Sequence, residues 1–330
     1  MRPVRAFVPA QDAIGVFCPS HSISEFPRRL DRGIAHLRET FGSVVKMAPH
    51  ALGRLGRLSG DTAQRTSDLE ALLRDPEVGL IMCGTGGYAS LDVALALDLD
   101  LFCAHPKPIV GFSDATALLL DLHRRSGRVT FHGPALLPSF GEAAILPWQG
   151  ADLLRMVTPA EGYRTVTNPP LLSETFQFWD RDDDTAPARQ APPGPRGFGT
   201  QVGRGPLIGG NLDTLVMMIA AGRMPDTSGA IVFWEAAFGQ LEKVRRDLTA
   251  LDLAGIFANA AGMVVGLPFC VDDGATILGL ATELAARRRL PMLFGLSIGH
   301  TSPILTLPLG AMATLDPNAA TLTIMEDTVV

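Results

Sequence analysis

The sequence has few cysteines and no cysteine pair at the spacing of a disulfide framework or a metal site. Its four cysteines, Cys18, Cys83, Cys103 and Cys270, are widely scattered, with no CxxC motif and no Cys/His cluster. Such scattered cysteines are typical of reduced core residues in a cytoplasmic protein. We therefore expect a cytoplasmic protein without disulfides and without a bound metal.

The chain also lacks a signal peptide and an uninterrupted hydrophobic run long enough to span a membrane. Residues 1–17 contain two arginines but only a short apolar run before Gln11. This pattern does not fit a secretory signal. Two uncharged stretches, 253–271 and 290–315, are broken by glycine, proline and polar residues. Buried strands and loops explain these stretches better than a membrane span.

Basic residues are outnumbered by acidic ones, and this argues against a polyanionic partner. The 34 acidic and 28 basic side chains give a formal net charge of -6 and a pI near 5.6. Neither nucleic acid nor an anionic membrane surface is favoured by this balance. We expect a peptide or peptide-like small molecule as the partner.

The 330 residues are 47% hydrophobic, which is sufficient for a large core and favours two domains. Strand-like and helix-like patterns alternate along both halves. Strands are predicted at 13–18, 44–47, 78–83, 108–112, 128–131, 229–235, 262–267, 291–296, 308–316 and 322–325. Helices are predicted at 26–41, 60–74, 113–127, 212–220, 241–251 and 277–288. This alternation predicts an α/β fold with parallel sheets, whose ligands bind at the carboxyl ends of the strands.

A change in composition separates the two halves. Residues 180–184 carry four acids and one arginine, and 186–195 are rich in proline. We interpret 166–205 as a flexible linker or an insertion beside the site. It would join an N-terminal α/β domain, 1–165, to a C-terminal α/β domain, 206–330.

The stretch KPIVGFSDATALLLDLHRRSG, residues 107–127, predicts a strand, a sharp turn and a helix, with Ser113 on the turn. A hydroxyl there lies beside the N-terminus of a helix, where free N–H groups stabilise an anion. This placement suits a serine nucleophile, because acyl transfer needs an exposed hydroxyl and donors for the oxyanion. Serine and aspartate are also the commonest N-cap residues, so a purely structural role is the alternative.

A second glycine-rich turn, GTGGY at 84–88, follows the strand at 78–83. Its backbone N–H groups could contact a ligand closely, as an oxyanion hole requires. The turn matches neither the G-x-G-x-x-G fingerprint nor a P-loop, so phosphate binding has little support. A simple tight turn is the structural alternative.

Glu235 and His300 each follow a buried-looking strand. A carboxylate at such a position needs a partner, because burying it unpaired is costly. Imidazole is a suitable one, so Ser113, His300 and Glu235 could form a hydroxyl, base and orienting carboxylate. An exposed strand end and a turn histidine are the structural alternatives. His132 is interpreted first as a structural histidine.

Several motifs, taken together and in order, resemble those of the LD-carboxypeptidases. This is the S66 family of serine peptidases, which includes microcin C self-immunity peptidases. The similarity extends from about residue 14 to residue 316. The motifs are GTGGY (84–88), GFSDATAL (111–118), FHGP (131–134), LIGGNL (207–212), VFWE (232–235), IGH (298–300) and LPLGAMATLD (307–316).

The resemblance implies a catalytic triad of Ser113, Glu235 and His300. It also implies an oxyanion hole formed by the backbone N–H groups of Gly86 and Asp114. The implied fold is a flavodoxin- or class I amidotransferase-like N-terminal domain and a C-terminal α/β domain, with the active site in the cleft between them. A homodimer without metal or organic cofactor is expected.

The reaction implied by the resemblance is release of terminal D-alanine from a murein tetrapeptide in cytoplasmic peptidoglycan recycling. The chain departs from the family at Thr85, where an arginine is frequent, and at Ala89, where a glycine is frequent. Gly87, Tyr88 and Trp179 are candidate substrate contacts, so these departures bear on specificity.

Three alternatives remain open. An immunity-type peptidase would cleave an aminoacyl-nucleotide amide, with Phe178 or Trp179 stacking on the base. A non-catalytic homologue would keep the cleft as a binding site for a small molecule. A nucleotide-binding protein would use 84–88 without hydrolysis.

Overall fold

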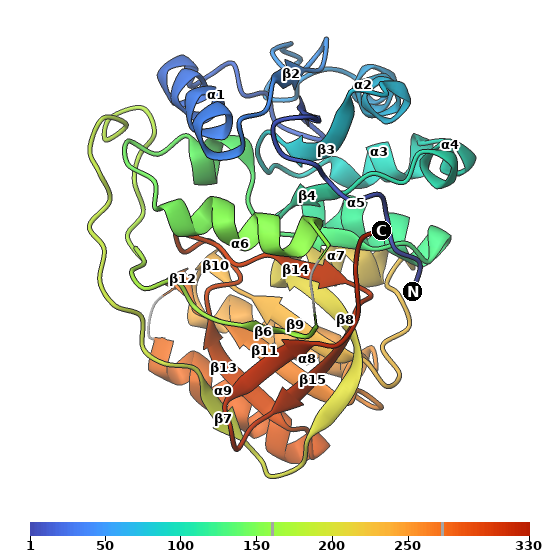
Figure 1. Ribbon diagram of the computed structural model, residues 1–330. Coiled ribbons are helices and arrows are strands. Elements are labelled where there is room, and N and C mark those ends of the chain that lie inside the picture. Colours follow the sequence, from blue (N-terminus) through green and yellow to red (C-terminus); the bar gives the residue numbers. More distant parts are fainter. Residues whose placement is uncertain (160–161, 272–273) are drawn as a thin grey trace.

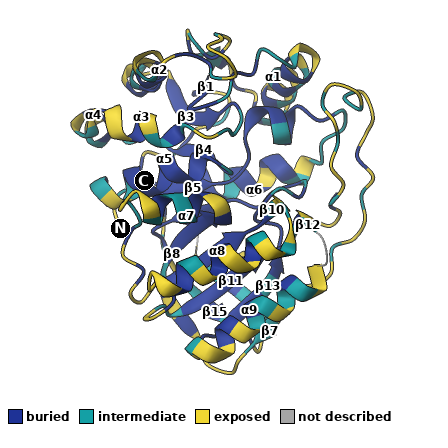
Figure 2. Ribbon diagram, turned by 180° about the vertical axis from the view of Figure 1, so that it is seen from behind, coloured by how far each residue is buried: buried dark blue, intermediate teal, exposed yellow. Residues whose placement is uncertain are grey.

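Two twisted sheets, one above the other in Figure 1, form the body of the protein. The computed structural model describes residues 1–159, 162–271 and 274–330. Helices cover the faces of both sheets, so the chain has the mixed α/β fold that the sequence predicts. In Figure 2 the strands are buried and the outer faces of the helices are exposed.

The first sheet has the strand order β14-β5-β4-β3-β1-β2. Its five N-terminal strands are parallel and are arranged 2-1-3-4-5, as in flavodoxin-like folds. The late strand β14 pairs antiparallel with β5 at the edge. The strands are β1 (Ala13–Phe17), β2 (Val45–Met47), β3 (Val78–Cys83), β4 (Ile109–Gly111), β5 (Thr130–His132) and β14 (Leu307–Leu309).

The helices of the first half begin and end at recognisable capping residues. The first helix has Pro27 at its first position and ends at Gly42 in the left-handed conformation. In the second, Asp61 and Gln64 form a reciprocal capping box. The helices are α1 (Pro27–Phe41), α2 (Thr62–Arg74), α3 (Ser90–Ala96), α4 (Leu99–Ala104), α5 (Ala115–Ser126), a short π-helix η1 (Leu136–Phe140) and α6 (Pro147–Val157).

The second sheet has the order β6-β16-β15-β8-β9-β11-β13-β7. Its four central strands, β8, β9, β11 and β13, are parallel, whereas the flanking strands pair antiparallel. The strands are β6 (Arg164–Val166), β7 (Arg196–Phe198), β8 (Gly203–Asn211), β9 (Ile231–Glu235), β11 (Gly262–Gly266), β13 (Met292–Leu296), β15 (Met312–Asp316) and β16 (Thr321–Ile324). The helices are α7 (Leu212–Ala220), α8 (Leu241–Leu253) and α9 (Gly274–Arg288), and a small parallel pair is β10 (Ala237–Gly239) with β12 (Phe269–Val271).

The two halves of the chain share strands and ion pairs. β14, from the end of the chain, completes the first sheet, and β6 lies at the edge of the second. The termini lie near each other in Figure 1, and Val4 forms a bridge with Val329. Buried Asp121 of α5 also pairs with Arg223, which follows α7. The halves therefore interlock.

The segment 167–195, here called the strap, runs along one side of the molecule between the halves (Figure 1). It contains no helix or strand among the described elements. Ion pairs hold it against α1, because Arg28 contacts Asp184 at 2.8 Å and Arg32 contacts both Asp183 and Asp184. The acidic run thus docks the strap on a basic helix face.

The four cysteines are free, as the sequence predicts, but only Cys18 and Cys83 are core residues, because Cys103 is half-buried and Cys270 is exposed. Burial raises the pKa of the Cys18 thiol to about 12, so this side chain stays neutral in the core. Within the described ranges, no helix has the length and apolar character needed to cross a bilayer.

The close approach of β8 to β9 depends on Gly209, and this gives a test of the packing. A Cβ at this position would lie within 3 Å of the Phe233 carbonyl group, which is backbone and cannot move aside. We expect Gly209→Ala to lower the free energy of unfolding by about 3 kcal/mol. The matched control is Gly279→Ala on the exposed face of α9, where a Cβ meets nothing within 4 Å. It should stabilise by about 0.5–1 kcal/mol. Urea unfolding of both variants measures the difference, and equal stabilities would contradict this account.

Candidate active site

The carboxyl ends of the parallel strands of both sheets meet at one pocket, here called the main pocket. From the first sheet come the turns after β1, β3 and β4, and from the second come the residues after β8, β9 and β13. Ligands bind at this edge of parallel sheets, as expected from the sequence. Lining residues include His21, Gly86, Ser113, Asn211 and His300.

Ser113 lies on a sharp turn between β4 and α5. Its φ of 60° places a non-glycine residue in the left-handed region, a strained conformation that recurs at functional sites. The turn is fixed by hydrogen bonds from the N–H of Ala115 to the Phe112 carbonyl and from the N–H of Thr116 to the Ser113 carbonyl. The Ser113 side chain therefore lies at the main pocket instead of capping the helix.

Two backbone amides, those of Gly86 and Asp114, lie beside Ser113. A Cβ at Gly86 would lie 3.1 Å from Ser113 Oγ and 3.9 Å from the Asp114 nitrogen, so the three groups are close. Among the described residues, neither the Gly86 N–H nor the Asp114 N–H donates a hydrogen bond. This arrangement has the composition of an oxyanion hole.

The Asp114 side chain has a separate structural task. Its buried carboxylate accepts hydrogen bonds from the N–H groups of Ala89 and Ser90 at 3.1 and 3.0 Å. Burial raises the pKa of Asp114, although these hydrogen bonds oppose the rise. Asp114 thereby ties the 84–88 turn to the turn that carries Ser113.

Glu235 and His300 form a buried hydrogen-bonded pair. His300 Nδ1 lies 3.0 Å from Glu235 Oε2, and Asn211 Nδ2 donates to Glu235 Oε1 at 2.8 Å. Glu235 is fully buried. Burial alone would raise the pKa of its carboxyl, but the pairing with His300 and the Asn211 hydrogen bond hold this pKa below its usual value. Glu235 is therefore an ionised partner for His300.

The bond from Nδ1 to Glu235 leaves His300 Nε2 as the free ring nitrogen. Ser113 and His300 line the same pocket. Among the described residues, Ser113 Oγ and His300 are not hydrogen-bonded to each other. Long or absent nucleophile–base bonds are common in sites without substrate.

Glycines and a buried histidine hold this pair in place. A Cβ at Gly299 would lie 2.5 Å from Glu235 Oε2, so any larger residue would displace the carboxylate. His132 of β5 is fully buried, and its Nε2 contacts the Ile298 carbonyl at 2.6 Å. His132 thus fixes the loop that carries His300, in agreement with the structural role favoured by the sequence.

Aromatic rings surround the His300 imidazole. Phe112 and Phe238 contact it edge-on with centroids 5.0 and 5.4 Å away, and Phe269 stacks at 6.2 Å. The His300 side chain is only 14% exposed. These rings limit water around the imidazole and fix its orientation.

The predicted substrate contacts differ in their setting. Gly87 lines the main pocket, and a Cβ there would lie within 3 Å of the Ser20 side chain. Tyr88 also lines it but is 90% exposed. Trp179, on the strap, packs edge-on against Phe26 with centroids 5.1 Å apart. All three reach the pocket that contains Ser113.

Two contributors were not identified from the sequence. Asn211 lies in the LIGGNL motif but was given no role, and its link to Glu235 appears only once β8 and β9 are paired. The sequence predicts a linker or insertion at 166–205, and the structure places aromatic residues of the strap within this range at the pocket. Within the described residues, no group of histidine, cysteine and carboxylate side chains is arranged to hold a metal ion.

Comparison with known proteins finds matches over both halves of the chain. Residues 14–133 match the LD-carboxypeptidase N-terminal domain, and residues 204–315 match the LD-carboxypeptidase C-terminal domain. A Vibrio cholerae protein whose name places it among carboxypeptidases is 32% identical over 314 residues, covering 92% of each chain. Murein tetrapeptide carboxypeptidase of Pseudomonas aeruginosa is 26% identical, covering 85% of this chain and 86% of its own.

The microcin C7 self-immunity protein MccF of Escherichia coli is 30% identical over 330 residues, covering 96% of this chain and 93% of its own. A solved structure of MccF in complex with aspartyl sulfamoyl adenosine matches with a TM-score of 0.93, at 28% identity and with full coverage of both chains.

The buried state of His132 gives a pH test of the site. Burial lowers the pKa of His132, and its hydrogen bond to Ile298 only partly opposes this. Below its unfolded pKa of about 6.5, the unfolded chain binds a proton that the folded chain does not. Stability is therefore full above this pH and falls as the pH drops below it.

The free energy of unfolding of the wild type should fall when the pH is lowered from 7.5 to 5.5. We expect the fall to be about 1 kcal/mol smaller for His132→Gln, which lacks this titrating group. Urea unfolding at both pH values measures this. His105→Gln, a substitution of an exposed histidine, is the control and should follow the wild type. A His132→Gln curve parallel to the wild type would show that His132 titrates freely.

Proposed function

Because the chain belongs to the LD-carboxypeptidase family, peptidase family S66, we propose that it is a serine hydrolase that releases a terminal D-amino acid from an L,D-peptide. The observation that carries this proposal is the buried Glu235–His300 hydrogen bond, on the pocket that also contains the strained Ser113. A base oriented by a carboxylate, beside an exposed hydroxyl, is the arrangement used for acyl transfer.

In the proposed first step, His300 Nε2 takes the proton from Ser113 Oγ as this oxygen attacks the amide carbonyl carbon. The negative charge moves to the carbonyl oxygen, where the N–H groups of Gly86 and Asp114 can receive it. Glu235 keeps its charge and stabilises the imidazolium that forms. The tetrahedral intermediate collapses as His300 gives its proton to the leaving nitrogen, and an acyl-serine and a free amine result.

In the second step, a water molecule replaces the departed amine. His300 takes one of its protons while the oxygen attacks the acyl-serine. Collapse of the second intermediate returns the proton to Ser113 Oγ and releases the shortened peptide as a carboxylic acid. No metal or organic group is needed to balance either step.

The proposed substrate is a murein tetrapeptide, from which the enzyme would release D-alanine in cytoplasmic peptidoglycan recycling. The name of the P. aeruginosa relative supports this substrate class. The polar and aromatic lining of the main pocket, together with its exposure to solvent at Tyr88, is compatible with a peptide that enters from outside.

A second candidate is cleavage of an aminoacyl-nucleotide amide. The structural match to MccF bound to aspartyl sulfamoyl adenosine favours it, as does the position of Phe178 and Trp179 on the main pocket. Aromatic side chains stack on nucleobases, and each such contact contributes about 1–3 kcal/mol.

Ser113→Ala tests the nucleophile. Because the acyl-enzyme cannot form, we expect D-alanine release from murein tetrapeptide to fall by about 10⁴-fold or more. The thermal unfolding temperature should change little, because the Ser113 side chain makes no hydrogen bond to another described residue. Ser67→Ala, on the exposed face of α2, is the matched control and should retain full activity. Retained release by Ser113→Ala would remove Ser113 as nucleophile.

Substitution of Trp179 separates the two substrates. If the nucleotide conjugate is the natural substrate, Trp179→Ala should lower its kcat/KM by about 10- to 100-fold, while Trp179→Phe should retain most of it. The same variants should cleave murein tetrapeptide nearly as well as the wild type. Equal losses on both substrates would instead assign Trp179 to the packing of the strap.

A further inference from the structure

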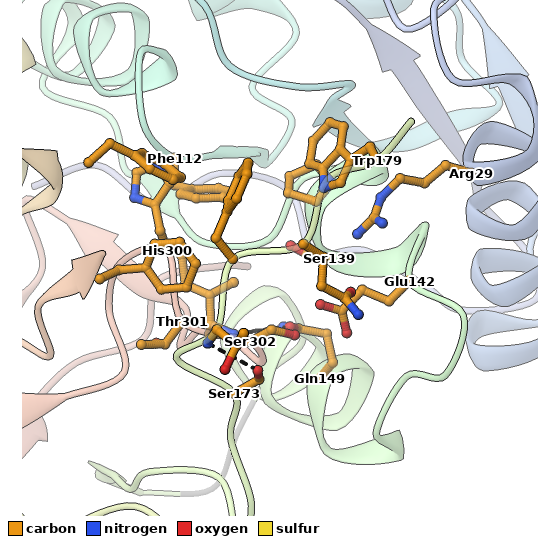
Figure 3. A pocket seen from close by; sticks show the side chains of 17 residues that line it. Arg29, Phe112, Ser139, Glu142, Gln149, Ser173, Trp179, His300, Thr301 and Ser302 are labelled. Atoms are coloured by element: carbon orange, nitrogen blue, oxygen red, sulfur yellow. Dashed lines mark hydrogen bonds between the residues drawn. The ribbon is translucent and has the colours of Figure 1, made fainter. Parts of the chain in front are cut away.

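A smaller cavity, here called the side pocket, adjoins the main pocket at His300 (Figure 3). Its volume is about 80 Å³. This volume can hold a group of a few heavy atoms, because a single water molecule needs only about 10–15 Å³. The two pockets adjoin and share six lining residues: Phe112, Pro138, Phe176, Trp179, Phe238 and His300.

The guanidinium of Arg29 points from α1 into the side pocket, as Figure 3 shows. The side chain is only 2% exposed. Its Nε donates to the Leu137 carbonyl at 2.8 Å, and the Trp179 ring lies 4.6 Å from its Cζ. Nη1 is buried and has no hydrogen-bond partner among the described residues. A buried donor without a partner is costly, so this nitrogen is suited to a ligand.

Arg29 shares its neighbouring carboxylates with other arginines. Glu142 is paired with Arg189 at 2.7 Å, and Asp183 is paired with Arg32. Arg29 Nη1 lies 3.5 Å from Asp183, at ion-pair distance, and forms no hydrogen bond to it among the described residues. Asp183 and Glu142 each pair with a second arginine as well, so neither neutralises Arg29 alone.

We propose that the side pocket binds the anionic group of the leaving part of the substrate, the terminal carboxylate of the released amino acid, with Arg29 as its ligand. This rests on the proposed function. His300 would protonate the leaving nitrogen, so the leaving residue lies beside His300, where the side pocket opens. A guanidinium binds a carboxylate through paired hydrogen bonds, and burial strengthens them.

This subsite explains how an exopeptidase would reject internal peptide bonds. A bond inside a longer chain carries a neutral amide where the terminal residue carries its carboxylate. Placing that amide against Arg29 would leave the buried charge unpaired, and the small side pocket has no room for further residues. The phosphoryl group of a nucleotide conjugate is also an anion that a guanidinium can bind. The test therefore covers both a terminal carboxylate and a phosphoryl group.

The test compares murein tetrapeptide with the same peptide carrying a C-terminal carboxamide, cleaved by wild type and by Arg29→Gln. The wild type should prefer the free acid. Arg29→Gln should lower kcat/KM for the acid by roughly 10- to 100-fold, mainly through KM, and leave cleavage of the amide nearly unchanged. The preference for the acid would then collapse.

Two variants control for structural damage. Arg28 is an exposed neighbour of Arg29 that also pairs with the strap. The Arg28→Gln variant should keep the wild-type preference for the free acid over the carboxamide. Arg29→Lys keeps the charge without the planar fork and should retain part of the preference. An unchanged preference in Arg29→Gln would overturn the proposal. If Arg29→Gln does not fold, full loss of preference in a folded Arg29→Lys supports it, and full retention overturns it.

A failure of the proposed function gives a different pattern. In that case the wild type releases neither D-alanine from the acid nor D-alaninamide from the carboxamide, although a phosphonate still labels Ser113. The variants are then assayed on an aminoacyl-nucleotide amide. A selective loss in Arg29→Gln identifies a phosphoryl group as the bound anion, and unchanged cleavage overturns the anion subsite.

Discussion

The buried carboxylate of Glu235 is the group on which the arrangement of the site depends. An ionised carboxylate without water is stable only with partners, and these come from two other strand ends: His300 after β13 and Asn211 at the end of β8. The parallel order of β8, β9 and β13 brings all three to one edge. Gly299 leaves the space that the carboxylate occupies. One charge therefore constrains strand register, loop conformation and ring orientation together.

Most of the central elements could be predicted from the sequence because their patterns are strong and local. The predicted ranges 78–83 and 212–220 match β3 and α7 in full, and Asp61 caps α2 as its residue type indicates. The short helices α3 and α4, the helix α6 and the strands β6, β7 and β8 were not predicted. The three-residue strands are set by the neighbours with which they pair, which a local pattern does not contain. The central strand β8 was missed because its sequence, GRGPLIGGN, is rich in glycine and contains a proline, and both residue types are rare inside strands.

The difference between local patterns and distant contacts also explains which site residues could be proposed from the sequence. Ser113, Glu235 and His300 each lie at or just after the end of an apolar strand, so their positions made them candidates, and the family motifs singled them out. Asn211, His132 and Arg29 gain their roles only from distant partners: Glu235, Ile298 and Leu137. No spacing rule connects such pairs. The strap is a similar case, since its acidic run indicates a loop, whereas its place beside the pocket depends on the basic face of α1.

The edge strand β14 has a consequence for how the protein matures. During synthesis the first half emerges with β5 unpaired on one side, and an open strand edge can pair with other chains. Closure waits until residues 307–309 have been synthesised, which is after residues 235 and 300. β14 covers β5 next to His132, which supports the His300 loop. Sealing the sheet and completing the site thus coincide, so a nascent or truncated chain lacks both.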